Sequence, residues 1–507
     1  MRLVEMRRNS IYFLLLIILP LNMIGQTTVK LKEAGSLTLV KIDGQSIQRL
    51  VDSVWLVQGN TNIYCDSAYL NKQTNSAQAF GHVKIIDTVD IIDIKADYLK
   101  YDGNVRKAFL RDNVVLKDDS ATLYTDKLDY DRITRIGTYF DGGKLIDPTS
   151  ILTSKRGFYN YITKESEFYD SVRMTNDEFY LETDTLFYNT INTDTRSIGK
   201  TLGVTQDADT LKTNTGLFYN RQKKYAEVYK GRIFNTEFDI EADTLITDDS
   251  LKLYKAYQNI TMVSKEDSLT IFGDKAKYDK LNNTAIAYEN AYLRKMMQGD
   301  SLFIRADTLF SDQSDPDNKF LKAYHDVRLF KSNLQGIADS MSYNFSDSTI
   351  FMYQDPVIWA NDSQLSADSI NIEIKNNKVD KMNLAIKSFV ISQDSTKNFN
   401  QISGKLMQIH FEEGIIQRTD VTGNGESIYY VLDDNGALSM NKLKCSNMIL
   451  YFEDNTVAEI RTYQEVDAQL IPGFKILPID RRLRGFNWRT SEKPKLRDIA
   501  RHLRYDR

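Results

Sequence analysis

The sequence predicts an all-β protein, an extended open stack of about thirteen repeats of roughly thirty residues each, and three observations support this prediction. A short motif that contains Asp recurs at nearly even spacing through most of the chain. The segments between its copies alternate apolar and polar residues, which is the pattern of strands with one buried face. Apolar residues inside the array do not keep a period of about 3.6 residues over three turns, so we expect little helix.

Residues 1–25 are predicted to form an export signal. Three arginines precede an apolar run, residues 11–24, and Gly25 follows it. The run is shorter than the roughly twenty apolar residues that a helix needs to cross a bilayer. We therefore expect an exported mature chain that starts near Gln26, and an uncleaved membrane anchor is the alternative.

The recurring motif is a small residue, then Asp, then an alternating run that often ends in Tyr, as in Asp184-Thr-Leu-Phe-Tyr188. Successive copies lie 29 to 33 residues apart, a regularity that chance does not produce. The marker positions are Asp66, Asp97, Asp126, Lys155, Asp184, Asn214, Asp243, Asp274, Asp307, Asp339 and Asp368.

The spacing also predicts how the chain is divided. The regular repeats define an array over residues 26–385. Weaker copies near Gly404 and Asn447 define divergent β repeats over residues 386–470. A basic, proline-containing tail, residues 471–507, follows them.

Each marker is predicted to be a corner at which a strand bends. In residues 94–101 the apolar positions are 94, 96, 99 and 101, so the alternation changes phase at Asp97. Such a slip would turn the apolar set outward unless the strand bends at a bulge. A second element recurs about fifteen residues later as an alternating run broken by Gly, Asn, Asp or His, as at Gly81-His82, and this pattern predicts short strands joined by tight turns. The bent strands would wrap two sheets around a continuous apolar interior.

The regularly spaced carboxylates could instead form a metal-binding ladder. Each repeat supplies only one carboxylate, however, and Lys155 and Asn214 replace it in two copies. The histidines are scattered through different repeats, and His82 and His325 occupy turn positions. We therefore predict no metal site and no cofactor.

Composition and motifs narrow the function classes. The chain has 65 basic and 69 acidic residues, so nothing in its charge points to nucleic acid. We find no glycine-rich phosphate loop and no nucleophile elbow. Cys65 and Cys445 lie beside corner markers and are interpreted as packing residues. We predict a non-enzymatic protein with no catalytic residues. The alternatives are an exported structural or adhesive β-solenoid without a lipid ligand and a β-helix enzyme that acts on polysaccharides.

Two stretches carry a resemblance to a known family. Residues 81–85 (Gly-His-Val-Lys-Ile) are followed by 94–97 (Ile-Lys-Ala-Asp), and residues 112–116 (Asp-Asn-Val-Val-Leu) by 121–126 (Ala-Thr-Leu-Tyr-Thr-Asp). This serial pattern resembles the OstA-like family of LptA-type lipopolysaccharide-transport proteins. The chain is similar to the long OstA-like proteins of Bacteroidota-type bacteria.

The resemblance implies a periplasmic protein with an open β-jellyroll whose apolar interior shelters the acyl chains of lipid A. Its implied partners are lipopolysaccharide, an inner-membrane exporter and the outer-membrane proteins that assemble lipopolysaccharide. On that basis, inward residues of the N-terminal repeats are candidates to line the lipid: Val83, Ile85, Ile94, Leu99, Val114 and Leu116.

The tail and the ends of the array are the remaining candidate interaction sites. Phe486 and Trp488 are interpreted as partner-docking anchors, with three arginines to pair with acidic groups or lipid phosphates: Arg481, Arg482 and Arg484. A solvated tail with a short helix over residues 495–504 is the alternative. The regular N-terminal repeats offer unpaired strand edges, which favours edge-to-edge bridging and head-to-tail self-association there, whereas the divergent C-terminal end is expected to be capped or dedicated.

Overall fold

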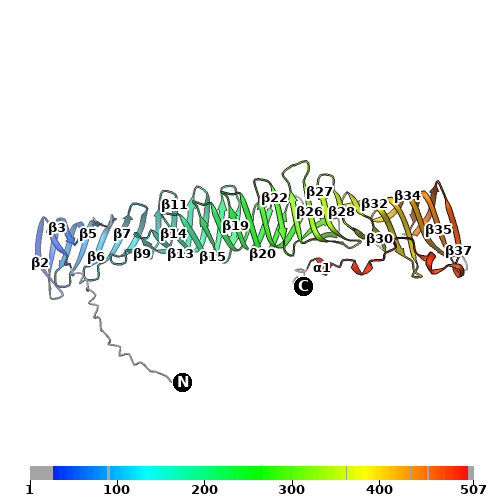
Figure 1. Ribbon diagram of the computed structural model, residues 1–507. Coiled ribbons are helices and arrows are strands. Elements are labelled where there is room, and N and C mark those ends of the chain that lie inside the picture. The colour runs from blue at the N-terminus through cyan, green and yellow to red at the C-terminus, as the bar shows by residue number, and fades with distance from the viewer. Residues whose placement is uncertain are drawn as a thin grey trace, which may run out of the picture. The chain divides into compact units, whose positions relative to one another are not determined.

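The computed structural model describes residues 27–500 apart from residues 88, 90–91, 237, 266–267, 298–299, 361, 433–435 and 454–455. It contains 37 strands and four short helical segments in that part of the chain (Figure 1). The predicted all-β class and the scarcity of helix are confirmed. The predicted export signal lies outside the described residues. None of the described helices is long and apolar enough to cross a membrane.

The strands follow one another with few interruptions. The first twelve are β1 Lys30–Glu33, β2 Ser36–Ile42, β3 Gln45–Gln58, β4 Thr61–Asn71, β5 Ser76–Asp87, β6 Ile92–Asp102, β7 Lys107–Lys117, β8 Thr122–Asp131, β9 Ile136–Tyr139, β10 Gly143–Ile146, β11 Ser150–Ser154 and β12 Arg156–Asn160. The next thirteen are β13 Glu165–Asn176, β14 Phe179–Asn189, β15 Asp194–Thr205, β16 Thr210–Thr213, β17 Leu217–Asn220, β18 Tyr225–Phe234, β19 Phe238–Asp248, β20 Leu253–Ser264, β21 Leu269–Asp279, β22 Thr284–Tyr288, β23 Tyr292–Met297, β24 Asp300–Arg305 and β25 Thr308–Asp312.

The remaining strands are β26 Phe320–Lys331, β27 Leu334–Asn344, β28 Thr349–Tyr353, β29 Val357–Ala360, β30 Ser363–Ser366, β31 Ser369–Lys375, β32 Lys378–Gln393, β33 Phe399–Glu412, β34 Ile415–Leu432, β35 Leu438–Glu453, β36 Thr456–Tyr463 and β37 Asp467–Pro472. The helical segments are the 3₁₀ turns η1 Gly473–Lys475, η2 Pro478–Arg481 and η3 Thr490–Glu492, and the helix α1 Leu496–Ile499.

The chain divides into two compact units, Met1–Leu145 with Phe158–Thr163, and Ile146–Gly157 with Lys164–Arg507. Both are built in the same way, from antiparallel strands in which each long strand pairs with the strands before and after it, as β4, β5 and β6 do. Each repeat therefore contributes two strands, or about 10 Å of stack at roughly 4.8 Å per strand.

The corner predicted at Asp97 is present as a bulge, because the register between β6 and β7 shifts between Lys95 and Tyr98. The tight turn predicted at Gly81-His82 is wrong, because β5 continues through these residues and bends there at a bulge. The register between β5 and β6 shifts between Phe80 and Val83, and Gly81 and His82 there have φ values of 71° and 41°. Positive φ suits Gly and short polar residues, which explains the composition of this position. Where the bend interrupts pairing altogether, one bent strand becomes two short ones, such as β9 and β10 or β16 and β17. The strand count therefore exceeds two for each repeat.

The marker Asp joins neighbouring corners. The Asp97 carboxylate accepts a hydrogen bond of 2.6 Å from the Asn113 amide, sixteen residues later on the next strand. The same bond recurs between Asp243 and Asn259 at 2.7 Å. His82 takes the Asn position, with its Nδ1 2.8 Å from Asp66. These hydrogen bonds connect the bends of neighbouring strands, so the marker carboxylates and His82 stabilise the corners.

In each unit the ends of the bent strands form two rows of turns. We call the row that includes residues 59–60 and 118–121 in the first unit, and residues 147–149 and 177–178 in the second unit, the first turn row. The second turn row comprises residues 72–75, 103–106, 132–135 and 161–163 in the first unit, and residues 190–193, 221–224, 249–252 and 280–283 in the second unit. Backbone hydrogen bonds stack its turns on one another, as from the Asp249 N–H to the Lys224 carbonyl at 2.9 Å.

The tail folds back along the outside of the second unit. Both β36 and β37 pair with β35, and the chain then reverses and runs past strands that lie earlier in the sequence (Figure 1). We call its described part, residues 473–500, the strap. The helix predicted over residues 495–504 is present as the single turn α1 within the described residues.

Candidate functional site

The predicted lipid-lining residues lie together in the interior of the first unit. All six are at most 3% exposed, namely Val83, Ile85, Ile94, Leu99, Val114 and Leu116. Ile94 pairs with Ile85 on one side and with Leu116 on the other, so they occupy successive strands and share one face. Their contact with lipid stays a prediction.

Tyrosines close the side of the interior in each unit. In four copies of the marker motif the terminal Tyr points its hydroxyl at a residue in or next to the first turn row, about forty positions earlier in the sequence, whereas Tyr130 bonds to Tyr161. The pairs are Tyr101 with Gln58, Tyr159 with Asp118 at 2.5 Å, Tyr188 with Asp147 at 2.6 Å and Tyr219 with Glu178 at 2.5 Å. The two turn rows therefore face each other, and we call the line between them the seam.

An ion pair reinforces the seam in the first unit. The Arg132 guanidinium lies 2.9 Å from the Asp87 carboxylate, and only 14% and 6% of these side chains are exposed. Burial acts to raise the pKa of Asp87, but hydrogen bonds from the Thr61 hydroxyl, the Val89 N–H and Arg132 outweigh it and lower that pKa. The carboxylate therefore stays charged, and Arg132 also donates to the Tyr101 hydroxyl at 2.9 Å.

The tyrosine bridges are held in their neutral form. Burial, and then the hydrogen bond to Asp147, raise the pKa of Tyr188 to about 12. Burial is also the main cause of the raised pKa of Tyr101. These hydroxyls therefore remain donors at neutral pH, and a carboxylate or amide oxygen accepts from each of them.

The predicted continuous apolar interior is interrupted at β14–β16, and that expectation is corrected here. The inward positions of β15 carry Thr195, Ser197 and Thr201, all at most 3% exposed, where β5 carries Ala and aliphatic residues. Thr201 bonds to Thr183 and to Ser197, both at 2.9 Å. Because these hydroxyls satisfy one another, they can be buried without water.

The interior becomes partly exposed after this belt. The residues Ile233, Ile240, Met262 and Ile271 pair in series across β18–β21 and face inward, yet all four are only half-buried. Tyr254 bonds to Asp249 of the same turn row at 2.6 Å instead of reaching across the seam. We call β18–β21, Tyr225–Asp279, the open section.

Beyond the open section the interior closes again around a large apolar cluster that extends from Leu269 to Leu450. A cavity of about 130 Å³ remains within it, between Leu302, Ile350 and Met382. Its mouth lies at the turns that carry Asn333 and Glu413.

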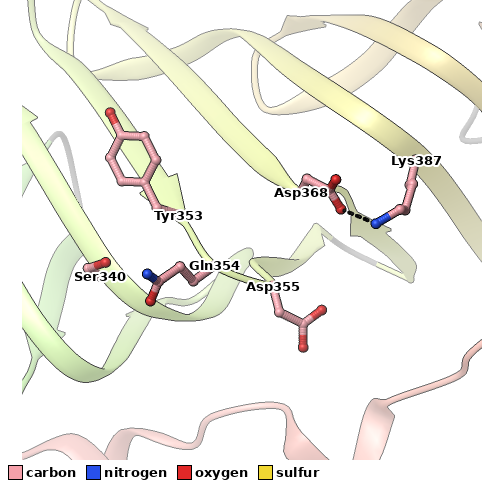
Figure 2. Close-up of a pocket in the computed structure, with 6 residues that line it drawn as sticks. All are labelled: Ser340, Tyr353, Gln354, Asp355, Asp368 and Lys387. Atoms are coloured by element: carbon pink, nitrogen blue, oxygen red, sulfur yellow. Dashed lines mark hydrogen bonds and ion pairs between the residues drawn. The ribbon is translucent and has the colours of Figure 1, made fainter.

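A shallow hollow of about 850 Å³ lies on the corner side of the second unit (Figure 2). Its lining residues are Ser340, Tyr353, Gln354, Asp355, Asp368 and Lys387. Lys387 and Asp368 form an exposed ion pair of 3.1 Å, whereas Tyr353 and Asp355 point in different directions (Figure 2). This arrangement brings no base against a nucleophile. Among the described residues, no group of three or more His, Cys, Asp or Glu could hold a metal ion.

The predicted tail anchors pack against their own chain. The Phe486 and Trp488 rings lie 5.2 and 5.4 Å from the Phe399 ring, centroid to centroid, and join an outward-facing cluster with Phe389 and Tyr430. The three predicted arginines remain exposed, and Arg482 stacks over Phe486. Docking of a partner by these residues stays a prediction. Four of the six residues of β37 are exposed among the described residues, and a capped or dedicated C-terminal end stays a prediction.

Two buried glutamines hydrogen-bond to the backbone of the strap, and the sequence did not predict this role for either of them. Gln401, 0% exposed, donates to the Arg481 carbonyl at 2.8 Å and accepts from the Leu483 N–H at 2.8 Å. Gln364, 1% exposed, makes the same pair of bonds with Asn487 and Arg489, both at 2.7 Å. A Gln in a strand carries no sequence signal for this role, whereas the recurring terminal Tyr of the marker motif could have indicated the seam.

Two family comparisons match separate parts of the chain. Residues 26–184 match the family described as OstA-like protein. Residues 270–378 match the family described as LptA/(LptD N-terminal domain) LPS transport protein. No curated protein matches the sequence at a significant level. The first match includes the predicted lipid-lining residues, and the second includes part of the cavity lining, such as Leu302 and Ile350.

Proposed function

We propose that this chain is an OstA-like protein of lipopolysaccharide transport that binds lipopolysaccharide in the periplasm and shelters the lipid A acyl chains in its interior. The matches of residues 26–184 and 270–378 to families of that kind support this proposal. The observation that carries this proposal is that inward aliphatic side chains line the interior of each unit, with the hydroxyl belt of β15 as an interruption in the second unit. Exposed acyl chains cost about 0.8 kcal/mol for each CH₂ group in water, so a carrier must cover them throughout their transfer. A channel lined by aliphatic groups does so without a reaction and without a trapping site.

The two ends of the array suit a bridge between an inner-membrane exporter and outer-membrane lipopolysaccharide-assembly proteins. In the first unit the terminal strand β2 leaves the inward residues Leu37 and Leu39 47% and 65% exposed. In the second unit β37 leaves Leu470 66% exposed. An unpaired strand edge beside exposed inward leucines can accept a further strand. We therefore assign bridging to both ends, with head-to-tail self-association as one form of it.

A structural β-solenoid is the second candidate, and the burial in the first unit favours it. A core in which Ile94 and Leu99 are 0% exposed, closed by tyrosine bridges, is full without a ligand. Lipid would then have to part the seam before it could reach these residues.

Photo-crosslinking distinguishes the two candidates. A crosslinking amino acid at Ile94 or Leu116 should capture lipopolysaccharide in living cells, whereas the outward positions Lys95 and Lys117 should not. Equal capture at both sets, together with purified protein free of co-extracted lipopolysaccharide, would reject the transport function in favour of the structural one.

A further inference from the structure

The first part of the strap turns three large apolar side chains toward solvent. We call residues 473–484 the proximal strap. Phe474, Leu477 and Ile479 within it are 87%, 60% and 84% exposed. Single exposed apolar residues are common on soluble proteins, and Leu281, the one such residue of its turn, is an example. Three within six residues form an exposed apolar patch, which is a mark of an interaction surface.

The patch faces solvent because the inward positions of the proximal strap are already filled. Ile476 and Leu483 point the other way and are buried in the cluster that contains Phe389 and Tyr430. Gln401 holds the backbone at Leu483 with its two hydrogen bonds to the strap. The two 3₁₀ turns η1 and η2 lie between these anchor points. The three exposed side chains therefore project from a segment whose backbone is held in place.

Cations surround the apolar patch. Four exposed side chains of the proximal strap are positively charged, namely Lys475, Arg481, Arg482 and Arg484. Within the described part of the chain, none of the four forms an ion pair. The one carboxylate of the proximal strap, on Asp480, lies 2.9 Å from the Lys442 ammonium, which neutralises it. The segment thus presents four unpaired positive charges beside its apolar side chains.

This combination suits the surface of an anionic bilayer better than a protein partner. Apolar side chains can enter the boundary between headgroups and acyl chains, while neighbouring cations contact lipid phosphates. A stable protein interface buries about 800 Å² on each partner and takes roughly 20–30 residues. The proximal strap has twelve residues, and two of its apolar side chains are already buried in the strap's own cluster. A bilayer needs no matching shape and can bind so small a patch.

We propose that the proximal strap is a membrane-contact site, at which Phe474, Leu477 and Ile479 enter the headgroup region of an anionic bilayer and the nearby cations contact its phosphates. This site goes beyond the proposed function, because it lies on the outside of the protein and binds the bilayer itself, with or without lipid in the interior. It would hold the end of the second unit that carries β37 at a membrane surface.

Binding to vesicles tests the membrane contact. The chain from Gln26 onward is used, so that the apolar run of residues 11–24 contributes nothing. It should co-sediment with vesicles of phosphatidylethanolamine and phosphatidylglycerol, which are anionic and contain no lipopolysaccharide. Binding to neutral phosphatidylcholine vesicles should be at least tenfold weaker, because they offer no negative surface to the four cations.

A triple change to Ser tests the apolar side chains: Phe474→Ser, Leu477→Ser and Ile479→Ser. It should weaken binding to the anionic vesicles at least tenfold, since the insertion of apolar surface is lost. Leu281→Ser changes a single exposed apolar residue of the second turn row, and as the control it should leave binding unchanged. All four changed side chains are exposed, so the circular dichroism spectrum and the urea unfolding midpoint should stay the same.

A double change, Arg481→Gln with Arg484→Gln, tests the cations. Each basic residue close to an anionic surface strengthens binding about fivefold, so this variant should bind the anionic vesicles on the order of twentyfold more weakly. Its weak binding to neutral vesicles should not change. Lys495→Gln with Arg497→Gln removes the same charge from two exposed positions at the other end of the strap. This matched control should change binding less than twofold.

The outcomes separate the membrane contact from other uses of the patch. No binding to anionic vesicles, or an equal loss in the control variants, would overturn the proposal. Self-association of the purified chain that the triple change abolishes, without vesicle binding, would assign the patch to a second copy and would also overturn it. Neither result bears on lipopolysaccharide transport, which crosslinking at the interior residue Ile94 tests separately.

Discussion

The bridged rungs and the open section are built from the same repeat, yet they treat their interiors differently. Around Tyr188 the inward residues are sealed, and Leu181 is 2% exposed. In the open section the equivalent Ile240 is half-buried although its strand bends and pairs in the same way. The same bent and paired backbone therefore surrounds interiors of different exposure, so the side chains and not the strand geometry account for the difference.

The largest expected effect on stability comes from changes in core packing. Leu181→Ala should destabilise the second unit by about 3 kcal/mol, because it empties a closed site. Ile240→Ala should cost about 1 kcal/mol, since the side chain it shortens is already partly hydrated. Urea unfolding followed by tryptophan fluorescence measures both. Similar losses at the two positions would show that the open section is as closed as its neighbours.

The strap offers the next comparison, because it braces the strands beyond the open section from outside. Gln401→Ala leaves the Leu483 N–H and the Arg481 carbonyl without their partner, at a cost of about 1–3 kcal/mol. Partial release of the strap would expose Phe389 and Tyr430, so binding of a hydrophobic dye should rise. Gln393→Ala, at an exposed position of the preceding strand, is the control and should change neither stability nor dye binding.

A single tyrosine bridge should contribute less to the free energy of unfolding than the contacts of Gln401 with the strap. Tyr188→Phe removes one hydrogen bond and should cost about 1 kcal/mol, because backbone N–H groups still reach Asp147. In a background without the two native cysteines, it should also raise the rate at which a maleimide labels Leu181→Cys toward the rate at Ile240→Cys. An unchanged labelling rate would mean that strand packing, and not the tyrosine, shuts the seam.

The same bridge predicts a pH dependence. The pKa of Tyr188 is raised from about 10 to about 12, so its neutral form is favoured by folding. Its contribution is complete below about pH 10 and is lost as pH rises to about 12. In a plot of the free energy of unfolding against pH, Tyr188→Phe should lose stability less steeply than the unchanged protein between about pH 10 and pH 12. Parallel plots for the two proteins would contradict the raised pKa of Tyr188.

The smallest effect is expected at the corners. The hydrogen bond and then the charge of Asp66 raise the pKa of His82, so the pair contributes below the ordinary pKa of His and loses its contribution as pH rises through the raised value. Both side chains are exposed, and water screens the interaction. His82→Asn, which restores the residue found at Asn113, should leave the unfolding midpoint unchanged at pH 5 and pH 8.

The features that could be predicted from the sequence are local and periodic. The marker spacing and its change of phase predicted the corners, and alternation predicted that Ile94, Leu99 and Leu116 face inward. These features follow from neighbouring residues on one strand and from pairing with the next strand, so they repeat wherever the motif repeats.

The closure of the channel depends on tertiary contacts between residues that are far apart in the sequence. Tyr188 meets Asp147 across a separation of 41 residues, and Gln401 meets Leu483 across 82, through contacts that no local pattern encodes. The hydroxyl belt of β15 was hidden for a related reason, because Thr alternates in a strand just as an aliphatic residue does. Strand periodicity reports which side chains point inward, but the polarity and access of that interior depend on side chains that meet from different rungs.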